Sequence, residues 1–144
     1  MKKLILISLF IPFAAKAQFR IVNTATTNLL ELRSGTWPIN LVKVTKESDT
    51  YYELQFRDQE YANGVIMKTL RFRDIEQLKY FQKGLSTLKT GTNGDIAEFK
   101  DYSIKRVDLK QETTWYTLNC GESGGVTNFQ QPEADKMIAA ILSL

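Results

Sequence analysis

Histidine is absent from this chain of 144 residues, and cysteine occurs only once, as Cys120. Histidine is the usual general base of serine and cysteine hydrolases and a common ligand of metals. A single cysteine cannot close a disulfide within the chain, so burial of apolar side chains has to stabilise the fold. We therefore expect no catalytic triad, no metal site and no bound cofactor.

Long apolar runs are also missing, apart from a short one near the start. The apolar stretch 4–13 follows two lysines and precedes the small-x-small sequence Ala15-Lys16-Ala17. It is too short to cross a bilayer, which takes about 20 apolar residues. The pattern predicts a cleaved secretory signal peptide at residues 1–17. Gln18 stands where a lipoprotein would carry cysteine, so no membrane anchor is expected after cleavage.

A large excess of one charge is missing too. The chain has 19 Lys and Arg against 16 Asp and Glu, but three of the basic residues lie in the predicted leader, which leaves 16 of each sign. A neutral mature chain lacks the basic footprint of a nucleic-acid-binding protein. We expect an exported protein, periplasmic or secreted, whose partner is another protein or an envelope component and not a nucleic acid.

The composition that remains is that of an ordinary globular domain, with 43% hydrophobic and 24% charged residues. Residues 18–144 are long enough to bury one core but not two. The sequence therefore predicts a single α+β domain over this range.

Two stretches have the spacing of amphipathic helices. In residues 75–89, apolar side chains recur every three or four positions, Asp74 is placed as the N-cap, and Gln77 completes a capping box. Residues 132–142 start with proline at the first helical position and contain an apolar stripe. Both helices are expected to pack on the apolar face of one antiparallel sheet.

Alternation of apolar and polar residues predicts the strands of that sheet. Residues 28–32 fit either a helix or a strand, with a strand favoured, and Trp37 beside Pro38 is expected in a loop. The remaining strands are expected at residues 41–45, 51–57, 65–73, 99–109, 115–120 and 126–129.

The two halves of the chain share a pattern. The order aromatic-Tyr-x-Leu-x-apolar occurs at residues 51–56 and again at residues 115–120, an offset of 64. Apolar residues around the two predicted helices match at an offset of 59, for example Leu85 with Leu144. Chance similarity between two amphipathic stretches is the alternative explanation. The matches predict a tandem of two β-β-β-α units as half-repeats, residues 18–91 and 95–144.

The motif most suggestive of catalysis is Gly121-Glu122-Ser123-Gly124-Gly125. It resembles the Gly-Asp-Ser-Gly-Gly sequence of trypsin-like proteases and fits the Gly-x-Ser-x-Gly nucleophile elbow. Both chemistries use histidine to take the serine proton, and this chain has none. We interpret the motif as a glycine-rich turn between two strands, and Cys120 as a buried, unreactive thiol.

Carboxylate chemistry needs no histidine, since glycoside hydrolysis uses two acids that flank the scissile bond. Asp95, Glu98 and Asp101 are spaced by three, but a strand splits such spacing between its two faces, and we expect these acids to be solvated. No other acids form a signature. A small carboxylate-based glycan hydrolase is kept as an alternative function.

Side chains that alternate away from the apolar stripes form the candidate interaction surface. Tyr51 and Trp115 occupy equivalent positions in the two halves, and Trp37 is a third candidate ring. If the halves are related by pseudo-symmetry, these rings line a shared surface; the alternative is that the core covers them. Arg71 and Arg73 lie on the polar face of their strand, which we expect to be solvated rather than a nucleic-acid platform.

These observations predict a non-catalytic exported module that binds a protein, a peptide or an envelope component. No catalytic or cofactor-binding residue is assigned. A histidine-independent glycan hydrolase is one alternative. An exported inhibitor or immunity-type protein is another, and it differs from the leading hypothesis only in its target.

Overall fold

A computed structural model describes residues 22–34, 37–61, 64–110 and 113–144. The predicted signal peptide, residues 1–17, lies outside the described residues. Two units follow one another along the chain, each a four-stranded antiparallel sheet that ends in a helix.

In the first unit the strands are hydrogen-bonded in chain order and the helix follows directly. Residues on alternate positions of the third strand are buried against the helices, and the residues between them face away. The elements are β1 (Thr24–Ser34), β2 (Trp37–Lys46), β3 (Asp49–Arg57), β4 (Met67–Phe72) and α1 (Ile75–Lys89).

The second unit repeats this order with shorter strands and one added helical turn between its last two strands. Its elements are β5 (Ile96–Glu98), β6 (Ser103–Leu109), β7 (Thr113–Asn119), α2 (Gly121–Gly124), β8 (Val126–Gln130) and α3 (Gln131–Leu142).

The α+β class with antiparallel sheets is confirmed, but each unit has four strands and the strands form two sheets rather than one. Two local features explain the additional strands. Strand β1 comes from the irregular region before residue 37, and Trp37 is the first residue of β2 rather than part of a loop. The predicted strand 99–109 is interrupted by a turn, in which the N–H of Phe99 donates to the carbonyl of Tyr102 at 2.9 Å.

Helix α1 begins where the sequence predicts. Asp74 is the N-cap, and its Oδ1 accepts a hydrogen bond from the N–H of Gln77 at 2.9 Å. The Gln77 side chain reaches back to the N–H of Arg73, at 2.8 Å, one residue before the cap. The hydrogen bond from the Gln77 backbone, aided by the Arg73 side chain, lowers the pKa of the Asp74 carboxyl.

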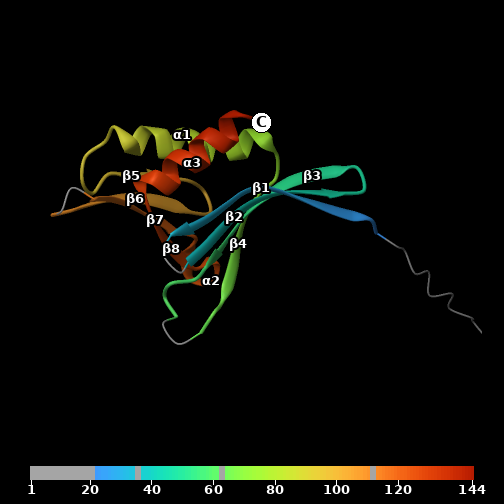
Figure 1. Ribbon diagram of the computed structural model, residues 1–144, viewed down its shortest axis with the longest axis horizontal. Coiled ribbons are helices and arrows are strands. Elements are labelled where there is room, and N and C mark those ends of the chain that lie inside the picture. Colours follow the sequence, from blue (N-terminus) through green and yellow to red (C-terminus); the bar gives the residue numbers. More distant parts are fainter. Residues whose placement is uncertain (1–21, 35–36, 62–63, 111–112) are drawn as a thin grey trace, which may run out of the picture.

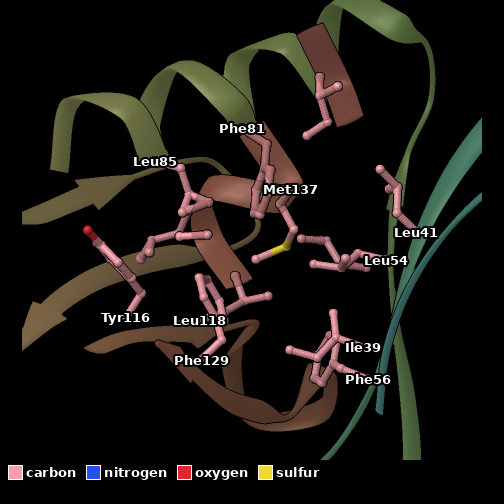
Figure 2. Close-up of a cluster of buried hydrophobic side chains, with 14 of the residues drawn as sticks. Ile39, Leu41, Leu54, Phe56, Phe81, Leu85, Tyr116, Leu118, Phe129 and Met137 are labelled. Carbon is pink, nitrogen blue, oxygen red and sulfur yellow. The ribbon is translucent and has the colours of Figure 1, made fainter. Parts of the chain in front are cut away.

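Helices α1 and α3 lie side by side and cover the inner faces of both sheets (Figure 1). One buried hydrophobic cluster draws side chains from both sheets and both helices. Figure 2 shows Leu54 and Phe56 of β3, Phe81 of α1, Leu118 of β7, Phe129 of β8 and Met137 of α3 converging on this cluster. The two units therefore share a core.

The strand pairing in the two sheets shows which residues of the two units are equivalent, and the offsets between them differ in part from those that the sequence pattern predicts. Strands β3 and β7 match at the predicted offset of 64, but Tyr52 pairs with Phe72 whereas Tyr116 pairs with Phe129, which makes β4 and β8 equivalent at an offset of 57. The connection between β3 and β4 is longer than that between β7 and β8, and apolar periodicity does not report the length of a connection.

The helices are equivalent at an offset of 56, which places the buried residues of α1 over those of α3: Leu78, Phe81 and Leu85 over Ala134, Met137 and Ile141. The predicted match of Leu85 with Leu144 is wrong, because Leu85 is fully buried and Leu144 is 49% exposed. That the two units arose by duplication stays a prediction.

Candidate functional site

Tyr51, Glu53 and Arg71 form a cluster on the outer face of the first sheet, the face away from the helices. The guanidinium of Arg71 lies 4.3 Å from the centre of the Tyr51 ring, and its Nη2 donates to Oε1 of Glu53 at 3.0 Å. Alternation places these residues together, since their neighbours Tyr52 and Phe72 face the core. The ring and the carboxylate hold an exposed guanidinium in one place.

A concavity of about 580 Å³ adjoins this cluster. It is lined by Tyr51, Arg71 and Arg73, by Gln77 of α1, and by residues 48–50 at the turn from β2 to β3. Arg73 is highly exposed, and its Nε lies 3.3 Å from Oδ2 of Asp74. The two arginines bring positive charge to one side of the concavity.

A second concavity, of about 220 Å³, lies between β4 and the turn from β5 to β6. Its lining includes Tyr80 of α1 and the turn residues Phe99 and Tyr102, whose rings stack with centroids 4.4 Å apart. Burial raises the pKa of the Tyr102 hydroxyl. Arg71 and Gln77 line both concavities, which makes them parts of one surface along β4.

The hydrogen-bond pattern between β3 and β4 determines which residues of β4 direct their backbone N–H and C=O groups away from β3. Residues in an antiparallel ladder exchange hydrogen bonds at every second pair. The N–H of Asp58 donates to the carbonyl of Ile66 at 2.8 Å, just beyond the ladder. Counting from this pair, the N–H and C=O groups of Thr69 and Arg71 point away from β3. We call these groups the β4 edge; among the described strands, none pairs with it.

The structure brings together three of the five candidate surface residues, namely Tyr51, Arg71 and Arg73. Trp115 is half-buried on the outer face of the second sheet, where it pairs with Val107 and Gln130, and it does not line the concavity that holds Tyr51. Trp37 lies at the start of β2, and its side chain is outside the described part of the structure. A surface shared by Tyr51 and Trp115 is therefore not supported.

The glycine-rich motif forms the single turn α2 and the residue that follows it, with positive φ at Gly121 and Gly125. Its role as a connection between β7 and β8 agrees with the sequence interpretation. Cys120 precedes it as a free, half-buried thiol that packs on the core cluster. Burial, with a contribution from the nearby Asp58 carboxylate, raises the pKa of this thiol to about 11. It is therefore protonated at neutral pH, when it is a poor nucleophile.

The described carboxylates are dispersed. Asp95, Glu98 and Asp101 are all exposed, and Asp95 accepts hydrogen bonds from the backbone and side chain of Thr92. No group of three or more Cys, Asp or Glu among the described residues is placed to hold a metal ion. Each of the two concavities beside β4 is lined by one carboxylate, Asp49 in the larger and Asp101 in the smaller.

The sequence interpretation missed Asp58, which is 1% exposed at the junction of the two sheets. Its Oδ1 accepts hydrogen bonds from the N–H groups of Glu60 and Val126, both at 3.1 Å, while its Oδ2 accepts no hydrogen bond from the described residues. In β3 every second residue is buried, namely Tyr52, Leu54 and Phe56, and Asp58 is the next residue in this series. An acidic residue at a position where alternation predicts burial was the signal that could have identified it.

Sequence comparisons assign no family to this chain. No protein-family model matches it, and no curated protein matches it in sequence. Within the residues that the structure describes, none of the helices combines the length and the apolar character needed to span a bilayer.

Proposed function

We propose that this protein is a non-catalytic exported module that binds a polypeptide partner through the surface along β4. The observation that carries the proposal is the juxtaposition of the β4 edge with two concavities of different character. One concavity holds Tyr51, Arg71 and Arg73, and the other is lined by Tyr80, Phe99 and Tyr102 among others.

A polypeptide suits this combination better than a small molecule does. Open N–H and C=O groups along a strand are complementary to the backbone of an extended peptide. Aromatic rings offer large contact area with little loss of side-chain entropy, and arginine contributes directed hydrogen bonds, so both are common anchors of protein interfaces.

The geometry around β4 bears on the alternative functions as well. A glycan hydrolase needs two carboxylates across one cleft, and the concavities beside β4 each provide a single acid. No observation therefore favours that alternative. An inhibitor or immunity-type protein would use the binding activity proposed here with an enzyme as its target.

Selection from a random peptide display library against the purified protein tests this function. We expect enrichment of peptides whose affinity falls by about 1–2 kcal/mol in Tyr51→Ala and in Arg71→Ala, since both side chains form the surface. Trp115→Ala and Lys105→Ala, on the outer face of the other sheet, serve as matched controls and should leave the affinity unchanged.

Circular dichroism and thermal melting of each variant establish that the fold is retained. The proposal would be overturned if no peptide were enriched, or if enriched peptides bound Arg71→Ala as tightly as wild type while Trp115→Ala lost them.

A further inference from the structure

The edge of β8 in the second unit is occupied by the first unit. Asp58 and Gln59, which follow β3, lie along this edge: the N–H of Gln59 donates to the carbonyl of Val126 at 2.8 Å, and the N–H of Val126 donates to Oδ1 of Asp58 at 3.1 Å. The Gln59 side chain continues the pairing, since its Oε1 accepts from Nδ2 of Asn128 at 2.6 Å. Backbone and side-chain groups of the first unit are thus already hydrogen-bonded to one sheet edge of the second.

The edges of β8 and β4 are structurally equivalent. The N–H of Cys120 donates to the carbonyl of Gly125 at 3.0 Å, so the backbone groups of Val126 and Asn128 point away from β7. At the offset of 57 these two residues correspond to Thr69 and Arg71 in β4, whose backbone groups point away from β3.

The ends of the two edges agree as well. In the second unit the N–H of Gln130 donates to the Glu133 side chain at 3.0 Å, across the start of α3. In the first unit the N–H of Arg73 donates to the Gln77 side chain at 2.8 Å, across the start of α1. Both edges are therefore closed at the same position. Among the described residues, Asp58 and Gln59 bond the rest of the β8 edge, and no strand pairs with the β4 edge.

We propose that the β4 edge, whose equivalent on β8 accepts hydrogen bonds from and donates them to Asp58 and Gln59, binds an extended acidic peptide segment as an added strand. The inference rests on the proposed function and specifies the partner. A carboxylate in the added strand meets the guanidinium of Arg71, and apolar side chains at the alternate positions face the concavity lined by Phe99 and Tyr102.

Charge at the equivalent positions determines this choice of partner. At the β8 edge the neutral amide of Asn128 is met by the neutral amide of Gln59. Arg71 replaces Asn128 at the β4 edge, and a guanidinium is matched by a carboxylate. Glu53 accepts a hydrogen bond from Nη2 of Arg71, and a guanidinium carries five N–H donors, so it accommodates a second carboxylate.

The same charges argue against two other occupants. Residues 67–73 contain Lys68, Arg71 and Arg73 and no acid, so a second copy of β4 would place like charges opposite each other. The chain before the described residues, 1–21, contains no acidic residue either. A partner with alternating acidic and apolar residues avoids both conflicts.

The test uses a synthetic peptide, acetyl-Thr-Val-Glu-Phe-Glu-Val-Thr-amide, whose symmetric pattern suits either strand direction. Its lysine counterpart, with both Glu replaced by Lys, is the control. Calorimetry on the full protein should show binding of the glutamate peptide at least about tenfold tighter than that of the lysine peptide. Arg71→Ala should bring the two affinities within about twofold of each other.

Backbone pairing has its own readout. The glutamate peptide should slow hydrogen exchange of the Thr69 and Arg71 amides and leave those of Leu70 and Phe72, which already bond β3, unchanged. Thr69→Pro removes an edge N–H without breaking the ladder to β3 and should weaken binding at least about tenfold. Thr69→Val keeps the N–H and is the matched control.

The outcomes separate this inference from the proposed function. If library peptides bind through Tyr51 and Arg71 but bind Thr69→Pro as tightly as wild type, the added strand is wrong and the binding function stands. If the glutamate peptide fails to bind, protects amides of β1, or finds the β4 amides already protected in the free protein, the inference is overturned.

Discussion

Both units consist of four antiparallel strands followed by a helix. The units differ in what bonds the free edge of the last strand, which is β4 in the first unit and β8 in the second. The β8 edge is closed by Asp58 and Gln59, a segment that the first unit contributes, whereas the β4 edge lies between two concavities and pairs with none of the described strands. A repeated fold thus produces one internal contact and one open surface, depending on where a connecting segment runs.

The outer faces of the two sheets differ in the same way. In the first unit Glu53 pairs with Arg71, an ion pair that leaves the guanidinium exposed. At the equivalent position of the second unit Thr117 donates to Asn128 at 2.6 Å, a neutral hydrogen bond. The charged pair lies beside the β4 edge and the neutral pair beside the β8 edge. This arrangement is expected if the charged groups of the first sheet recognise a partner and the neutral groups of the second sheet pack against the first unit.

The largest effect that tests this comparison is in the shared core. Phe81 and Met137 are equivalent, and both are 1% exposed. We expect Phe81→Ala to lower the free energy of unfolding by about 4 kcal/mol and Met137→Ala by about 3 kcal/mol. Because both residues belong to one cluster, each variant should shift a single transition in urea, followed by circular dichroism and by tryptophan fluorescence. Two separate transitions would show that the units unfold independently.

A smaller effect concerns the closed edge. Asp58→Ala removes the acceptor for the N–H of Val126 from a buried site and should lower the free energy of unfolding by about 2–4 kcal/mol. Hydrogen exchange of the Val126 amide should become faster at the same time. Glu60→Ala, at an exposed neighbour, is the matched control and is expected to change stability by less than about 0.5 kcal/mol. Equal effects of the two substitutions would contradict the role given to Asp58.

The smallest effect tests the N-cap of α1 through the pH dependence of the free energy of unfolding. Asp74 has a lowered pKa in the folded state, mainly because its carboxylate accepts the hydrogen bond from the N–H of Gln77. The stability it contributes is present above its unfolded value of about 3.8 and is lost as pH falls through the folded value. Asp74→Asn retains a capping acceptor that does not titrate.

This variant should therefore show a weaker loss of stability below about pH 4 than wild type does, when urea midpoints are measured across the acid range. Asp108 has a lowered pKa as well, chiefly through its hydrogen bond with Arg106, so Asp74→Asn should not remove the acid dependence entirely. An unchanged pH profile would show that Asp74 contributes nothing to it.

Local features of the structure were predictable because they depend on neighbouring residues. Periodicity located α1 from Ile75 to Lys89, and the capping chemistry located Asp74. Alternation placed Tyr51 and Arg71 on the polar faces of their strands. Each of these assignments follows from the pitch of a helix or the pleat of a strand.

Features that join distant segments were not predictable in the same way. The junction at Asp58 links residues 68 positions apart. Gly125 makes that contact possible, since a Cβ there would lie 2.7 Å from Oδ2 of Asp58. The periodicity around residue 58 does not predict a contact with the glycine-rich motif, and the motif does not predict a contact with residue 58. The division into two sheets depends on such contacts.

The sequence by itself determined the α+β class, the limits of the long helices and the absence of histidine chemistry, since these follow from composition and from repeats of two or of about four residues. Only the tertiary structure decided that β8 is covered and β4 is open. The physical reason is that an edge strand bonds whichever backbone reaches it, and which backbone does so depends on the packing of the two units around their common core.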